Sequence, residues 1–307
     1  GPISAGRKGL RGKRRVSWGL RVGRVSVGLP LPISGGRFRC VRWSLSAALI
    51  VPWVVPALLI VILIGTEQPR ARWVYEDVSY ALFPSAERAF SIAERSLNAR
   101  NAHEYDFVRA EKYYREAERL DPTLPFLYHE LSRISFLKGD FAVALARINV
   151  EIARHGDTQP RSYYIRGLVE GYMGLYDAAV DDFAHFLRQV PPSWAGANDY
   201  AWALLKAGRP AEAVDITDQA LAIFPNNPWL LNSAAIARAE VGDAEGAREA
   251  IQKAARSSLQ VTEADWLYAY PGNDPTIASE GVHALQVSIL RTMHHLNQAR
   301  AGSATQS

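Results

Sequence analysis

The hydrophobic and polar positions of this 307-residue chain divide it into parts with different periodicity. An uncharged and largely apolar run covers Ser44 to Ile64. From about residue 85 to residue 261 the pattern is that of paired helical runs, and an amphipathic stretch covers Pro275 to Ala299. We therefore expect an all-α protein in which one apolar segment precedes a helical domain.

A unit of about 34 residues repeats within the helical domain. Gly174, Gly208 and Gly242 are each 34 residues apart, and each is followed five residues later by an alanine. Two helical runs, Ala195 to Ala207 and Pro210 to Ile223, flank Gly208, whose missing side chain permits a positive φ. One helical hairpin cannot bury its own apolar side, so about five hairpins are expected to stack into a solenoid.

Small residues are expected where the two helices of each hairpin cross, because bulk there would separate the backbones. The first helices supply Ser132, Gly167, Ala201 and Ala235, and the second helices supply Ala144, Ala179, Ala213 and Ala247.

These residues resemble tetratricopeptide repeats from about Ser85 to Gln260, best in Tyr163 to Pro191. The first unit departs from the pattern, since His103, Glu104 and Tyr105 stand where the junction glycine is expected. The resemblance implies a solenoid that binds peptides or proteins rather than performing chemistry.

The resemblance also implies that the first helix of each hairpin lines a concave groove. Asn198 and Asn232, 34 residues apart, could form a pair of amides that hydrogen-bond a peptide backbone. Arginines could pair with a carboxylate, and tryptophans could either anchor a partner or belong to the core between repeats. The candidate groove residues are His129, Arg133, Arg161, Tyr164, Asn198, Trp202, Trp229 and Asn232.

A search for catalytic motifs finds no phosphate loop, nucleophile elbow, HExxH or EF-hand pattern. The single cysteine, Cys40, excludes an intramolecular disulfide and a cysteine zinc site. We expect no enzyme activity, no cofactor and no metal.

The run from Ser44 to Ile64 has 21 residues, enough to span a bilayer core. Thirteen of them are Leu, Ile or Val, which favours insertion by about 4 to 8 kcal/mol. A transmembrane helix is expected, with the lipid bilayer as a partner. A cleaved signal peptide is the main alternative, although the residues after Ile64 lack a small-x-small cleavage pattern.

Charge predicts the orientation of this span. Residues 1–66 contain eleven basic residues and no acidic one, which leaves 24 basic against 31 acidic residues in the remainder. The basic tail is therefore expected in the cytoplasm, against anionic lipid rather than nucleic acid, with the solenoid in the periplasm. We therefore expect a single-pass protein of the inner, cytoplasmic membrane. The alternative is the mitochondrial inner membrane, with the solenoid facing the intermembrane space.

The last helix is expected to cap the solenoid rather than to form a sixth repeat. Its apolar stripe would cover the open end of the stack and consists of Ile277, Val282, Leu285, Ile289, Met293 and Leu296. The expected organisation is a disordered basic tail (1–43), a transmembrane helix (44–64), a connector (65–84), the solenoid (85–261), an aromatic loop with the capping helix (262–300) and a polar tail (301–307).

Two functions are compatible with this organisation. In the first, a membrane-anchored module docks a peptide or protein partner on the non-cytoplasmic side. In the second, the chain is a permanent structural or assembly subunit of a membrane complex, with its span packed against other transmembrane helices.

Overall fold

The computed structural model describes residues 69–98 and 102–304 of the chain. Every regular element in this part is a helix, which confirms the all-α prediction. Ten helices form five consecutive hairpins, in agreement with the predicted repeat. They are α3 (Ala86–Leu97) with α4 (Phe107–Leu120), α5 (Leu127–Leu137) with α6 (Phe141–His155), α7 (Arg161–Tyr172) with α8 (Tyr176–Gln189), α9 (Trp194–Lys206) with α10 (Pro210–Ile223), and α11 (Pro228–Glu240) with α12 (Ala244–Ser258).

Glycine makes the turn in four of the five hairpins, as the repeat predicts. Each of these glycines has a φ between 73° and 87°, the left-handed region that a side chain disfavours. The four residues are Gly139, Gly174, Gly208 and Gly242. The first hairpin lacks this turn and uses the longer segment between α3 and α4 instead. There Asp106 caps α4 by accepting a hydrogen bond from the backbone N–H of Arg109 (2.8 Å).

The predicted helix crossings are closely packed. Ser132, Ala201 and Ala235 are fully buried on the first helices. A Cβ atom on Gly167 would lie 3.1 Å from the ring of Phe183, tighter than an ordinary van der Waals contact. Small residues are therefore needed here because side chains of the second helix already fill the space.

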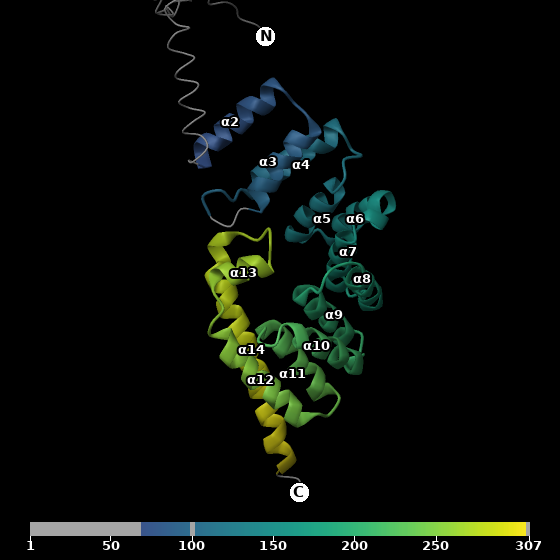
Figure 1. The fold of residues 1–307 in the computed structure, drawn as a ribbon, viewed down its shortest axis with the longest axis vertical. Coiled ribbons are helices and arrows are strands. Elements are labelled where there is room, and N and C mark those ends of the chain that lie inside the picture. The colour runs from purple at the N-terminus through teal and green to yellow at the C-terminus, as the bar shows by residue number, and fades with distance from the viewer. Residues whose placement is uncertain (1–68, 99–101, 305–307) are drawn as a thin grey trace, which may run out of the picture.

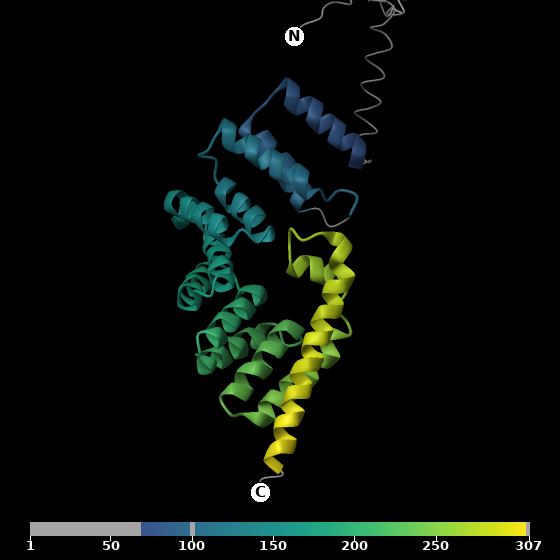
Figure 2. The ribbon, with the colours of Figure 1, turned by 180° about the vertical axis from the view of Figure 1, so that it is seen from behind.

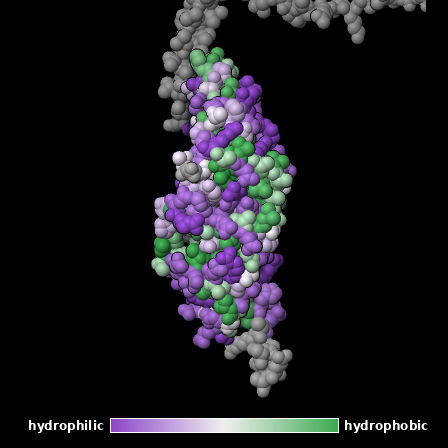
Figure 3. All heavy atoms as spheres, turned by 90° about the vertical axis from the view of Figure 1, so that its right-hand side faces the viewer, coloured by the Kyte–Doolittle hydropathy of each residue, from purple (hydrophilic) through white to green (hydrophobic). Residues whose placement is uncertain are grey.

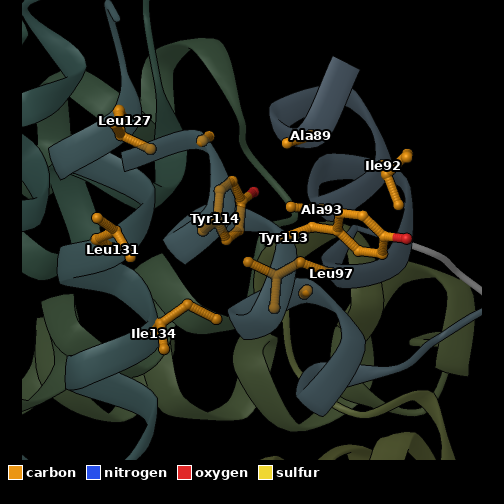
Figure 4. Packing of buried hydrophobic residues seen from close by; sticks show 11 residues of the cluster. Ala89, Ile92, Ala93, Leu97, Tyr113, Tyr114, Leu127, Leu131 and Ile134 are labelled. Carbon is orange, nitrogen blue, oxygen red and sulfur yellow. The ribbon is translucent and has the colours of Figure 1, made fainter. Parts of the chain in front are cut away.

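Tyr114 is the largest fully buried side chain of the first two hairpins. It belongs to α4 and lies between residues of α3, including Ile92 and Leu97, and residues of α5, including Leu127 and Leu131 (Figure 4). This cluster joins the first repeat to the second through apolar contacts.

The five hairpins follow one another along a curved stack, while the C-terminal segment runs back along its other side (Figures 1 and 2). This segment contains α13 (Glu263–Ala269), a 3-10 helix (Pro275–Ile277) and α14 (Ala278–Ala304). In Figure 1 the helices α6 and α8 lie on the outer edge of the stack, whereas α13 lies across from the first helices. The first helices therefore face the C-terminal segment.

The C-terminal helix α14 packs against α11, α12 and α13, as a cap would. Leu285 and Ile289 are buried there, and Val282, Met293 and Leu296 pack around them. Trp266 of α13 fills the space over Gly281, where any side chain would collide with the indole. Ile277 departs from the predicted stripe because it belongs to the 3-10 helix and is exposed.

One more helix, α2 (Pro69–Leu82), precedes the first hairpin and lies within the expected connector. Across residues 69–98 and 102–304, no helix combines the length and the apolar character needed to cross a bilayer. The run from Ser44 to Ile64 lies outside the residues that the structure describes.

Candidate protein-interaction surface

All eight candidate groove residues lie on the first helices of consecutive hairpins. They are His129 and Arg133 on α5, Arg161 and Tyr164 on α7, Asn198 and Trp202 on α9, and Trp229 and Asn232 on α11. Some of their side chains form hydrogen-bonded groups, whereas others are packed between neighbouring repeats.

A polar row crosses the helices α7, α9 and α11. The hydroxyl of Tyr164 donates to Oδ2 of Asp199 (2.6 Å), and Nδ2 of Asn198 donates to Oδ1 of the same carboxylate (3.1 Å). The hydroxyl of Ser233 then donates to Oδ1 of Asn198 (2.8 Å). Three consecutive hairpins are therefore linked by side chains on one face. We call Tyr164, Asn198, Asp199 and Ser233 the polar row.

The carboxyl group of Asp199 is the electrostatic centre of the polar row. Desolvation raises the pKa of Asp199 to about 6, although hydrogen bonds from Tyr164 and Asn198 act in the opposite direction. Burial, followed by the adjacent Asp199 carboxylate, raises the pKa of the Tyr164 hydroxyl well above its ordinary value. Tyr164 is therefore a neutral donor at neutral pH, and Asp199 titrates near the physiological range.

Asn232 lies on α11 next to Ser233, at the end of the polar row. Its Oδ1 atom is buried and accepts no hydrogen bond from any residue that the structure describes. An amide oxygen without a donor costs free energy when it is removed from water. This atom is therefore an unsatisfied acceptor at the end of the polar row, and a bound group reaches it only when the Asn232 side chain turns outward.

Asn198 and Asn232 are not hydrogen-bonded to each other, because the side chain that reaches Asn198 is Ser233. This contact spans 35 residues, as do the hydrogen bonds from Tyr164 to Asp199 and from Arg133 to Asn98. Neighbouring first helices thus meet with an offset of one residue from the 34-residue period.

The N-terminal part of the same face is occupied by the chain itself. Arg133, whose side chain is 14% exposed, donates to the carbonyl oxygen of Pro271 (2.8 Å). The hydroxyl of Tyr105 donates to the carbonyl oxygen of Gly272 (3.1 Å). The ring of Tyr270 lies 6.4 Å from that of Trp229. The segment Tyr270 to Gly272, which we call the C-terminal turn, therefore connects the first two repeats to the fifth.

Two carboxyl groups lie beneath Arg133. Glu130 forms a 2.6 Å ion pair with it, and the Tyr114 hydroxyl donates to Glu94 (2.6 Å) and to Glu130 (3.3 Å). Burial raises the pKa of Glu130 and of Glu94. Burial acts to lower the pKa of Arg133, but Glu130, Tyr114 and Glu94 together outweigh it, so the pKa of the guanidinium is raised and the group stays protonated.

His129 is a structural residue on this face. It is buried, its Nδ1 atom lies 3.1 Å from the hydroxyl of Ser162, and burial lowers its pKa to about 3, with Arg133 and Arg161 adding to the effect. The imidazole is therefore neutral at neutral pH. Arg161, in the first turn of α7, is exposed.

The two candidate tryptophans pack between repeats. Trp202 covers Gly171 of the preceding hairpin and lies 5.8 Å from the ring of Tyr172. Trp229 is buried, with its ring centre 5.1 Å from that of Trp194. The sequence left two interpretations of these tryptophans, an anchor for a partner or a part of the core between repeats. The contacts of both residues fit the core.

Several residues of this surface were not predicted from the sequence. A search for polar residues separated by one or two residues more than the repeat length could have found Asp199, Ser233, Glu94 and Glu130. The C-terminal turn has no such signal, because its contacts depend on the curvature of the whole stack. In the described ranges no group of three or more His, Cys, Asp or Glu side chains is placed to hold a metal ion.

Comparisons with known proteins agree with this fold. Residues 204–265 match a family model described as a tetratricopeptide repeat. Protein FlbA of Caulobacter vibrioides is 28% identical over 141 residues, which is 46% of this chain and 24% of that protein. The chain thus spans about a quarter of the length of this curated relative.

Solved structures of MamA are similar to part of this chain. One is 16% identical and has a TM-score of 0.47, and the match covers 57% of this chain and 94% of the chain in that structure. MamA from Desulfovibrio magneticus RS-1 is 18% identical with a TM-score of 0.40, covering 56% of this chain and 94% of that one. The repeat match and the helical hairpins define a solenoid of the protein-interaction scaffold class.

Proposed function

We propose that this chain is a membrane-anchored protein-interaction module, whose solenoid docks a peptide or protein partner on the non-cytoplasmic side of the membrane. The observation that carries the docking part is the polar row with the adjacent Asn232. Its donors and acceptors lie on three consecutive first helices, and one buried amide oxygen has no donor within the described chain. A peptide N–H group would satisfy that oxygen once the Asn232 side chain turns outward to meet it.

The membrane part of the proposal is supported by the sequence. The uncharged run Ser44 to Ile64 is long enough to span a bilayer. All eleven basic residues among the first 66 lie before this run begins. An export-dependent reporter fused at Phe83 tests the orientation. Activity is expected only when the fusion point lies outside the cytoplasm. Activity of a cytoplasm-dependent reporter at the same position would reverse the orientation.

Site-specific photocrosslinking tests the docking surface. A photoreactive residue at Arg161, exposed at the edge of this face, is compared with one at Arg188, exposed on the second helix α8. In native membranes we expect a crosslinked product of defined mass from position 161 and none from position 188. Equal products from both positions would contradict the assignment of the face.

The variant Asn198→Ala, Asn232→Ala then tests the polar groups. Loss of two hydrogen bonds costs about 1 to 3 kcal/mol in total, which corresponds to about 5- to 150-fold weaker capture. A matched control, Asn226→Ala with Gln260→Ala, removes two exposed amides elsewhere and should leave capture unchanged. Similar capture by both double variants would show that the polar row does not contribute to docking.

One observation favours the alternative of a permanent subunit of a membrane complex. The N-terminal part of the concave face already holds the C-terminal turn through Arg133 and Tyr105, which leaves less of the face open to a long peptide. Extraction in mild detergent followed by size separation distinguishes the two. Migration near the monomer mass supports docking, whereas stable migration in one large assembly supports a subunit.

A further inference from the structure

The helix α2 is attached to the solenoid by its polar side. Glu76 is buried and forms ion pairs with Arg95 (2.8 Å) and Arg109 (3.1 Å). Asp77 pairs with Arg109 (2.6 Å) and accepts a hydrogen bond from the hydroxyl of Tyr113 (2.5 Å). These contacts hold α2 against α3 and α4.

Aromatic side chains strengthen the same attachment. The ring of Tyr80 meets the edge of the Tyr113 ring at 5.2 Å, and its hydroxyl donates to Glu116 (3.1 Å). The guanidinium of Arg109 lies 5.5 Å from the centre of the Trp73 ring. Residues 73, 76, 77 and 80 therefore form the inward side of α2.

The outward side of α2 is apolar. Val74, Val78 and Leu82 follow at four-residue steps and are 56%, 49% and 67% exposed, with the half-exposed Tyr75 beside them. At 100° per residue these positions lie opposite the inward side. None of them is acidic. We call Val74, Tyr75, Val78 and Leu82 the outer stripe.

This arrangement is the reverse of an ordinary surface helix, which buries its apolar stripe and exposes its charges. Scattered exposed aliphatic residues are normal, but a continuous stripe opposite a set of paired carboxylates indicates an apolar environment outside. Hydrophobic surface is also visible at the end of the molecule where α2 ends (Figure 3).

The position of α2 in the chain indicates which environment this is. Only residues 65–68 separate Ile64, the end of the apolar run, from Pro69. Even when fully extended, this link reaches about 17 Å. If the run spans the bilayer, α2 begins at the membrane surface and Arg70 and Arg72 accompany it there. A second copy of the chain is a poorer fit, because a stable interface needs roughly 20 to 30 residues a side.

We propose that α2 lies in the membrane interface, with the outer stripe buried at the boundary between lipid headgroups and acyl chains. This rests on the proposed membrane anchoring. An amphipathic helix binds a bilayer in this way through its apolar face, while its polar face stays outside the hydrocarbon. Here the polar face is already paired to the solenoid. The ion pairs of Glu76 and Asp77 thereby fix the orientation of the solenoid, and of its concave face, relative to the membrane.

Lipid quenching of a fluorescent label tests this proposal in the full-length chain. Cys40→Ser removes the single cysteine, and an environment-sensitive dye is attached at Val78→Cys. The protein is reconstituted alone into vesicles of phosphatidylcholine and phosphatidylglycerol, with or without brominated acyl chains. We expect at least twofold quenching by the brominated lipid. A dye at Leu259→Cys, on a residue 77% exposed next to the last repeat, should show no quenching.

A third label at Leu58→Cys, within the apolar run, separates this proposal from the anchoring itself. Quenching at position 58 without quenching at position 78 overturns the interface helix and leaves the anchor standing. Absence of quenching at both positions overturns both. Protection of position 78 from aqueous iodide without lipid quenching means that a second copy covers the stripe, which also overturns the proposal. A label at Val74→Cys repeats the measurement if the dye at position 78 reduces helicity.

Discussion

Arg133 and Pro271 are 138 residues apart in the chain, yet the guanidinium of Arg133 donates a 2.8 Å hydrogen bond to the carbonyl oxygen of Pro271. The same guanidinium is paired with Glu130 beneath it. One side chain therefore neutralises a buried carboxylate of the second repeat and holds the C-terminal turn against the concave face.

Replacing this arginine should be costly. Arg133→Met keeps the apolar stem but leaves Glu130 without its partner, and breaking a buried pair in this way costs about 3 to 5 kcal/mol. Chemical unfolding of a fragment of residues 69–307 measures the loss. The double variant Arg133→Met, Glu130→Gln should recover part of it, because the unpaired charge is gone.

Tyr105→Phe is the matched control for the turn alone. It removes only the hydrogen bond to Gly272 and should cost about 0.5 to 1.5 kcal/mol. If Arg133→Met costs no more than Tyr105→Phe, the ion pair with Glu130 does not stabilise the fold.

The variant Gly167→Leu should destabilise the third hairpin. A side chain at this position meets the ring of Phe183, and such overpacking costs about 1 to 3 kcal/mol. Thermal unfolding followed by circular dichroism should show a lower Tm, and the loss should spread to neighbouring repeats because the stack is cooperative. Gly139→Asn is the control, since no atom lies within 4 Å of a Cβ there and asparagine tolerates a positive φ. A Tm for Gly167→Leu at or above that of the control would contradict the predicted crossing.

Asp199 should make stability depend on pH. Its pKa is raised to about 6 in the folded protein from an ordinary value of 3.8, so the folded state binds the proton more tightly than the unfolded state. The contribution of Asp199 to stability is therefore greatest below pH 4 and is lost as the pH rises through about 6.

The variant Asp199→Asn isolates this effect because it cannot ionise. Relative to wild type it should gain stability between pH 4 and pH 7, by no more than about 3 kcal/mol for a pKa raised from 3.8 to about 6. Urea unfolding at pH 4, 5, 6 and 7 measures the difference. A difference that is independent of pH would mean that the Asp199 carboxyl group is not desolvated in the folded protein.

Truncation after Ser258 should expose the apolar end of the stack. It removes α13 and α14, so the buried residues Ile251 and Ala254 of α12 lose the cover of Leu285 and Ile289. We expect the truncated fragment to have a lower Tm and to aggregate in sedimentation experiments, whereas a fragment that ends at Gln298 should not. A truncated fragment that stays monomeric and equally stable, but loses a partner, would make α14 an interaction arm instead of a cap.

The sequence by itself determined the repeating part of this protein. The 34-residue spacing of glycines and the small residues at the crossings follow from local rules, because helix periodicity and turn conformation depend on residues close in the chain. The resemblance to tetratricopeptide repeats then placed the eight candidate residues on first helices, where the structure has them. Repeats then stack because each one leaves an apolar side open.

Only the tertiary structure decided which side chains meet. The offset that pairs Asn198 with Ser233 instead of Asn232 depends on how neighbouring hairpins are rotated. The contact between Arg133 and the C-terminal turn depends on the curvature of the whole stack. The reversed polarity of α2 depends on basic and aromatic residues contributed by α3 and α4. Each of these contacts joins segments far apart in the chain, and their geometry is determined by packing, which the periodicity of the sequence does not encode.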